Sequence, residues 1–86
     1  MRERTACRIC GYLFDEDPWG EDGESPTYWI CPCCGGEAGF DDRNREAIRR
    51  YRRDWIFSGA NWFEPDERPD GWRLADQLVQ VPDEFQ

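Results

Sequence analysis

Four cysteines in this 86-residue chain have the spacing of a metal site. Cys7 and Cys10 form one C-x2-C pair, and Cys31 and Cys34 form a second pair after 20 intervening residues. Two residues between paired cysteines allow a tight turn, the knuckle, that brings both sulfur atoms to one ion at about 2.3 Å for zinc. Two such pairs are typical of a tetrahedral four-cysteine site. The spacing therefore predicts that these four cysteines bind zinc, with iron as the alternative metal.

The fifth cysteine lies within CPCCGG at residues 31–36, and we leave it out of the site. A glycine serves best after the second cysteine of a knuckle, where φ is positive. Gly35 follows Cys34, as Gly11 follows the first pair, whereas using Cys33 would give C-x-C and misplace the glycine. We favour Cys33 as a small buried residue over an exposed redox thiol. Five ordinary buried or disulfide-paired cysteines, or a redox C-x-x-C, are alternatives that the two knuckle glycines and the lack of a βαβ pattern disfavour.

The rest of the composition excludes several kinds of enzyme. The chain has no His and all 11 bases are Arg, which excludes Ser-His and Cys-His catalysis, a Schiff base and a P-loop. Four thiolates also close the zinc shell, so no position is open to a substrate. We therefore expect a protein that is not an enzyme.

The charge pattern bears on partners and location. The net charge of -8 repels phosphate backbones, so nucleic acid is not an expected partner. Six Arg at residues 43–53 could form a basic stripe, although a solvated helix face paired with neighbouring acids is favoured. No signal or transmembrane segment is visible, so we expect a cytoplasmic protein, with no membrane contact, whose cysteines hold metal rather than disulfides.

The residues around the cysteines resemble a rubredoxin. CRICGYLFD matches the family's C-x-x-C-G-Y-x-[YF]-[DN] opening, and WICPCCG matches its W-[VI]-C-P-x-C-G closing. The resemblance covers residues 7–40 and implies a ribbon in which two knuckles lie on short β-hairpins. It also implies an iron site for electron transfer and three core rings: Tyr12, Trp29 and Phe40. Residues 41–86 have no rubredoxin counterpart.

A second resemblance covers the chain more fully. The CPCC motif at residues 31–34, the upstream C-x-x-C-G-Y and the acidic composition are similar to the cysteine-rich CPCC proteins of bacteria. That resemblance implies metal binding and a bacterial cytosolic origin, and it brings no catalytic residues.

Two helices are expected after the ribbon. Asp41 and Asp42 should open the first by capping, and Gly59 should end it. Its apolar residues recur at helical spacing and predict a buried stripe of Ala47, Ile48, Tyr51 and Trp55, with Arg45, Arg49, Arg52 and Arg53 off that stripe. A short helix should follow from Trp72 to about Val79, with Leu74, Leu78 and Val79 as its apolar contacts. We expect Trp62 and Phe63 to anchor the loop between the helices, and residues 82–86 to fray.

These observations predict a small α+β fold: a rubredoxin-like zinc ribbon at residues 1–40, then one longer and one short α-helix at 41–86, in a single domain. A chain this short has little apolar core, and a metal would replace part of it. The leading hypothesis is a structural zinc protein that acts by binding an unknown protein partner. The alternatives are a rubredoxin-type iron electron carrier and an acidic immunity-like or inhibitor-like partner of a basic protein. We expect a monomer or a weak homo-oligomer, with Trp19 or Trp62 exposed for self-association.

Overall fold

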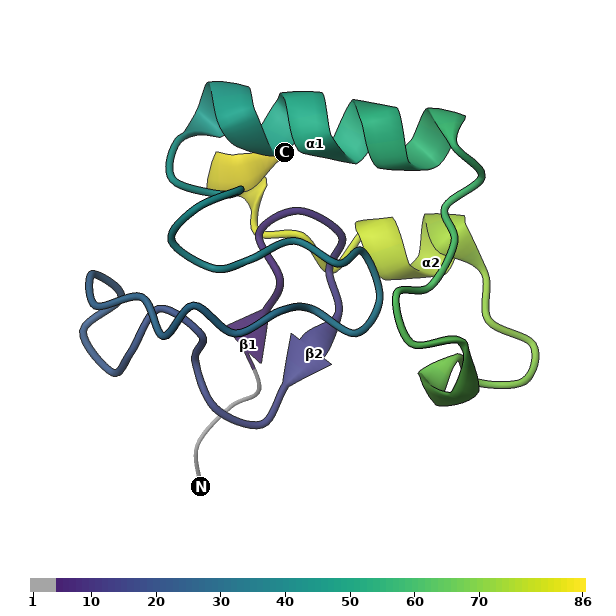
Figure 1. The fold of residues 1–86 in the computed structure, drawn as a ribbon, viewed down its shortest axis with the longest axis horizontal. Helices are drawn as coiled ribbons and strands as arrows, with labels where there is room; N and C mark the ends of the chain where they lie inside the picture. The colour runs from purple at the N-terminus through teal and green to yellow at the C-terminus, as the bar shows by residue number, and fades with distance from the viewer. Residues whose placement is uncertain (1–4) are drawn as a thin grey trace.

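The computed structural model describes residues 5–86 as a small α+β fold (Figure 1). Two antiparallel strands, β1 (Thr5–Ala6) and β2 (Leu13–Phe14), flank the first knuckle. The helices are α1 (Arg45–Phe57) and α2 (Leu74–Leu78), and two 3-10 turns, η1 (Pro65–Glu67) and η2 (Asp83–Phe85), follow one after each helix. Within this described part of the chain, no helix has the length and apolar character needed to cross a membrane.

The second knuckle has much less strand structure than the first. Only an isolated bridge between Ile30 and Glu37 joins its two arms. Residues 27–31 (TYWIC) are of types that favour a strand, but they do not form one, because Tyr28 takes a φ of 62° and interrupts the extended backbone. The resemblance implied a hairpin under each knuckle, and the structure has a strand ladder under the first knuckle.

Helix α1 begins later than the sequence predicts. Its N-cap is Asn44, whose Oδ1 accepts a hydrogen bond of 2.8 Å from Ala47 N. Asp41 and Asp42 were wrongly predicted as caps, because their carboxylates instead accept hydrogen bonds from backbone N–H groups of residues 37 and 39. The predicted end is confirmed, with Ser58 as C-cap and Gly59 at a φ of 111°.

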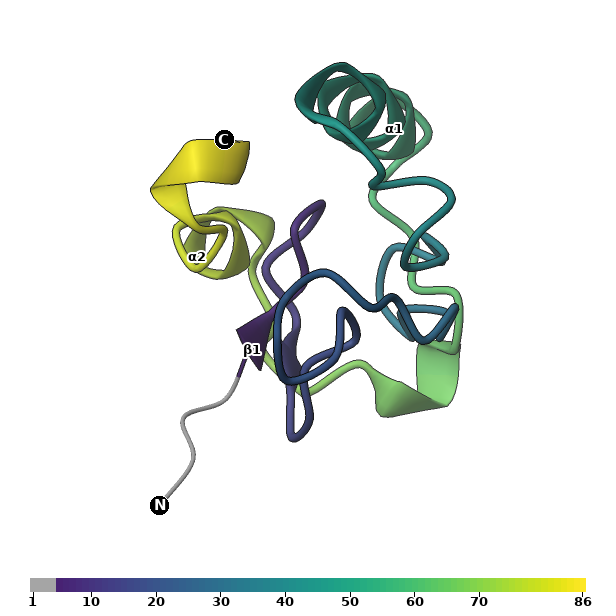
Figure 2. The same cartoon turned by 90° about the vertical axis from the view of Figure 1, so that its left-hand side faces the viewer.

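The first knuckle lies between the two helices, as the two views together show (Figures 1 and 2). The inward face of α1 buries Ile48 and Trp55, as the stripe predicted. Helix α2 is shorter than predicted and buries Gln77, whereas Val79 is 76% exposed and was wrongly expected as a contact. Residues 82–86 do not fray: η2 packs under α1.

The aromatic core differs from that implied by the rubredoxin resemblance. Tyr12 packs edge-to-face on Phe14 and Trp62, and Trp62 packs in the same way on Trp72. Trp62 is buried and unavailable for self-association. Three rings that were expected to pack inside do not join this core: Trp29 (41% exposed), Phe40 (62%) and Phe63 (58%). The helical extension therefore supplies one of the two rings that pack on Tyr12, which is Trp62.

Candidate metal centre

The four predicted cysteine ligands come together in the centre of the molecule. The sulfur atoms of Cys7, Cys10, Cys31 and Cys34 all lie within 4.8 Å of one another, and all four residues are buried. Two separations across the pairs are 3.9 Å for Cys7–Cys34 and 3.6 Å for Cys10–Cys31. A tetrahedral ion with metal–sulfur bonds of about 2.3 Å separates its sulfur ligands by about 3.8 Å. The donor set and its spacing therefore fit one tetrahedral metal ion.

The two knuckles have the same backbone turn. Gly11 N donates to Cys7 O at 3.0 Å, and Gly35 N donates to Cys31 O at 2.9 Å. Both glycines have positive φ, at 89° and 77°, as the sequence predicted. A side chain at Gly11 would also overlap the Gln77 carbonyl oxygen. Glycine at this position therefore serves both the knuckle turn and the close approach of α2.

Cys33 lies outside the group of four and is fully buried. The Gln77 side chain binds next to it: Nε2 donates to Cys33 Sγ at 3.1 Å and to Cys10 O at 3.2 Å. The Gln77 Oε1 atom accepts from Trp72 Nε1 at 2.7 Å. The two contacts from Nε2 attach α2 to the knuckles, and the contact with Trp72 orients the amide; Cys33 is a packed residue of that junction.

Helix α1 contacts both knuckles through polar side chains. Arg52 Nε donates to Ile9 O at 2.6 Å, and its Nη2 donates to Arg8 O at 2.9 Å and to Phe85 O at 2.7 Å. Tyr51 OH donates to Cys34 O at 2.8 Å, and burial raises the pKa of Tyr51 to about 12. Arg52 was wrongly predicted to lie off the buried stripe. Positions 48, 51, 52 and 55 are spaced i, i+3, i+4, i+7, and that spacing could have identified it.

The crowding of the four thiols has an electrostatic consequence. The adjacent Cys31 sulfur raises the pKa of the Cys10 thiol, and the Cys10 thiol in turn lowers the pKa of Cys7 by hydrogen bonding to it. Four buried thiols at this spacing cannot all ionise without a cation, because each thiolate disfavours the next. A bound divalent metal removes this conflict and holds all four as thiolates.

Acidic and basic residues are unevenly distributed between the ribbon and the segment that contains helix α1. Residues 9–42 contain nine acidic residues and no base, whereas residues 43–53 contain six Arg. Most Arg side chains of this cluster are exposed on α1, which runs along the top of the molecule in Figure 1, whereas the acidic loop at residues 15–26 projects at the left. Two ion pairs, Arg50–Glu46 and Arg53–Asp54, offset part of the positive charge on α1, as the solvated-face interpretation expects.

A relative of this chain covers most of its length. The YozI protein of Bacillus subtilis is 33% identical over 94 residues, which span 91% of this chain and 78% of YozI. This chain belongs to the YozI family. A second Bacillus subtilis protein, YoaQ, is 29% identical over 80 residues, which span 76% of this chain and 68% of YoaQ. Both relatives are uncharacterised proteins.

Rubredoxin of Megasphaera elsdenii is similar to part of this YozI-family chain. The two are 36% identical over 44 residues, which span 41% of this chain and 83% of that rubredoxin. No family model and no solved structure matches the chain. Together with the four clustered cysteines, these comparisons describe a cysteine-rich, rubredoxin-like bacterial protein that can bind a metal ion.

Proposed function

We propose that this protein holds one structural zinc ion on Cys7, Cys10, Cys31 and Cys34 and acts by binding a protein partner. The supporting observation is the make-up of the core. Of the five largest fully buried side chains, three are cysteines, and the other two are Ile9 and Ile48. Cysteine side chains bury little apolar area, so packing alone gives this core little stability. A metal ion bound to the sulfur atoms of Cys7, Cys10, Cys31 and Cys34 supplies the stability that packing does not.

The helical extension supports a structural role for that metal. Contacts from Arg52 and Gln77 fix α1 and α2 to backbone carbonyls within the first knuckle. An ion bound there holds the ribbon and both helices in place at once. Four thiolates fill the shell of zinc, and so we propose a binding protein rather than an enzyme.

Metal content and the visible spectrum test this proposal. The protein is purified anaerobically from cells supplied with both iron and zinc. One equivalent of zinc in a colourless sample is the expected result, together with loss of near-ultraviolet circular dichroism when the zinc is removed. Protein that stays folded and monodisperse after complete removal of the metal contradicts a structural role.

An iron electron carrier is the second candidate, and the similarity to rubredoxin favours it. The same four sulfur atoms bind iron in a tetrahedral site, and the acidic ribbon suits docking to a basic redox partner. A red sample with one iron that cycles reversibly between its oxidised and reduced forms would support this candidate over zinc.

The remaining parts of the proposal concern setting and partner. The motif CPCC supports membership of the cysteine-rich CPCC proteins, and we place the protein in the cytoplasm because reduced cysteines persist there. The net charge of -8 supports a basic protein as partner, which includes the case of an immunity-like or inhibitor-like protein. A pull-down from the source lysate that recovers no basic protein contradicts this last part.

A further inference from the structure

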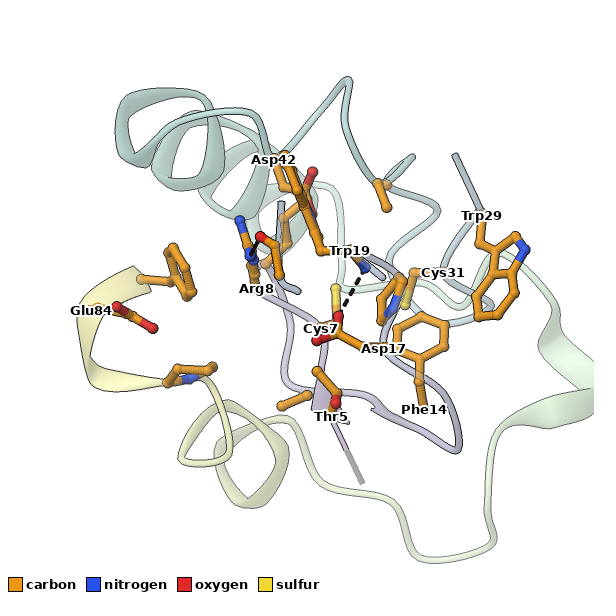
Figure 3. Close-up of a pocket in the computed structure, with 18 residues that line it drawn as sticks. Thr5, Cys7, Arg8, Phe14, Asp17, Trp19, Trp29, Cys31, Asp42 and Glu84 are labelled. Carbon is orange, nitrogen blue, oxygen red and sulfur yellow. Dashed lines mark hydrogen bonds between the residues drawn. The ribbon is translucent and has the colours of Figure 1, made fainter. Parts of the chain in front are cut away.

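A cavity of about 260 Å³ opens beside the metal centre, and the proposed function does not use it (Figure 3). Cys7 and Cys31 are part of its wall. In the view of Figure 3, Cys7 lies between Arg8 on one side and Phe14 and Trp29 on the other. The wall carries four aromatic rings: Phe14, Trp19, Trp29 and Phe85. The cavity is therefore ring-lined and close to two of the sulfur ligands.

The ionisable groups of this cavity are mainly acidic. Asp17, Asp42 and Glu84 line it, against the single guanidinium of Arg8. Asp42 is buried and accepts hydrogen bonds from Trp19 Nε1 at 2.9 Å and from Gly39 N at 2.7 Å. Metal-bound thiolates at Cys7 and Cys31 would add negative charge to the same wall. The cavity thus favours a positively charged ligand.

Asp17 is the carboxylate best suited to pair with a ligand. Its Oδ1 accepts a hydrogen bond of 2.8 Å from Trp19 N, which fixes the side chain. Its Oδ2 accepts no hydrogen bond from any group of residues 5–86. A held carboxylate with one open oxygen can accept a charged N–H from a ligand.

One cationic side chain of the protein, that of Arg8, already packs against aromatic rings of this wall. The guanidinium carbon of Arg8 lies 4.1 Å from the ring centroid of Trp19 and 4.5 Å from that of Phe85. Its Nη2 also donates to Gly23 O at 3.3 Å. Arg8 therefore covers two of the four rings. Those of Phe14 and Trp29 remain, and a second cation could lie against their faces.

We propose that this cavity binds an organic cation, a guanidinium or alkylammonium group, which lies against Phe14 and Trp29 and pairs with Asp17. The ring quadrupoles attract the charge, and the carboxylate accepts its N–H groups. The cation reaches the cavity either as a small molecule or as a side chain of a partner protein. The site rests on the proposed metal in two ways: through the fold that the metal holds, and through the negative charge of its thiolates at Cys7 and Cys31.

Paired ligands of equal shape test the charge requirement. Nα-acetyl-arginine amide and its neutral analogue Nα-acetyl-citrulline amide are titrated into metal-loaded full-length protein by calorimetry, and the indole N–H signals are followed by NMR. The arginine derivative should bind at least tenfold more tightly than the citrulline derivative and shift the Trp29 signal. Equal affinities, or no saturable binding of either ligand, overturn the proposal. If methylguanidinium binds with the same affinity as the arginine derivative, the result supports a small-molecule ligand. If it binds tenfold more weakly, the result supports a side chain of a partner protein.

Variants locate the site and separate it from the metal. Asp17→Asn keeps the oxygen that accepts from Trp19 N, so the loop stays folded while the charge is lost. This variant and Trp29→Leu should each weaken binding of the arginine derivative by about tenfold. The matched controls Asp70→Asn and Phe57→Leu, at exposed positions outside the cavity wall, should not change it. If fully metal-loaded Asp17→Asn protein binds the arginine derivative as tightly as the wild type does, the cation site is wrong. If the wild type itself contains little metal, the proposed function is wrong instead.

Discussion

Replacing Arg52 by Met should destabilise the protein by about 3 kcal/mol. The substitution keeps an unbranched side chain and removes a guanidinium that makes three hydrogen bonds, at 2.6, 2.9 and 2.7 Å, to the carbonyls of Ile9, Arg8 and Phe85. Each such bond contributes roughly 1 kcal/mol net, which gives the total. Burial lowers the pKa of Arg52, which shows that desolvating its charge costs free energy in the folded state. Met carries no charge and avoids this cost, so the loss of stability should be at or below about 3 kcal/mol.

Arg49→Met is the matched control on the same helix. Arg49 is exposed and makes one hydrogen bond of 3.2 Å, from Nε to Gln86 O, so its loss should cost less than about 1 kcal/mol. The free energy of unfolding of both variants is measured by urea titration. The protein and zinc concentrations are kept the same, because a bound metal contributes to the measured free energy. For a domain of this size, 3 kcal/mol lowers the melting temperature by about 12–24 °C. If the two variants differ in free energy of unfolding by less than about 1 kcal/mol, Arg52 does not fix α1 to the first knuckle as described.

Three further predictions concern the metal centre and its supports. Cys33→Ala should keep one metal equivalent by elemental analysis and Cys34→Ala should lose it, whereas metal loss in both would place Cys33 among the ligands. Gly11→Ala should destabilise the protein by roughly 2–4 kcal/mol in urea unfolding, against roughly 1 kcal/mol for Gly71→Ala, because both glycines have positive φ but only the first approaches another backbone closely. Since the pKa of Tyr51 is raised to about 12 from 10.0, its contribution to stability is present below pH 10 and lost as the pH rises towards 12. The ionisation of tyrosine is followed by absorbance at 295 nm in the wild type and in Tyr51→Phe. If the step that the variant lacks lies near pH 10 rather than near pH 12, the raised pKa of Tyr51 is contradicted.

The parts of the site that sequence predicted are those governed by local structure. A knuckle closes within five residues, so spacing and one glycine identify Cys10 and Cys34 as second members of their pairs. The buried stripe of α1 is likewise a property of one helix, and Ile48 and Trp55 follow from its period.

The parts that sequence did not predict depend on distant partners. Asp42 has the same capping preference as Asn44, but its two carboxylate oxygens accept from Gly39 N and from Trp19 Nε1, and Trp19 is 23 residues away. Gln77 contacts Cys10 across 67 residues, which no local pattern reveals. Trp29 was expected in the core, but Trp62 from the helical extension packs on Tyr12 instead.

The difference in charge between an acidic ribbon and a basic α1 gives this molecule an electric dipole. In the field of a charged protein such a dipole experiences a torque, and it turns before any surfaces touch. A basic partner would therefore meet the ribbon and the ring-lined cavity before α1. The orientation is set during approach and weakens as added salt shortens the Debye length to about 10 Å at 0.1 M. A basic molecule that approaches this 86-residue chain is thus turned towards the cavity before it makes contact.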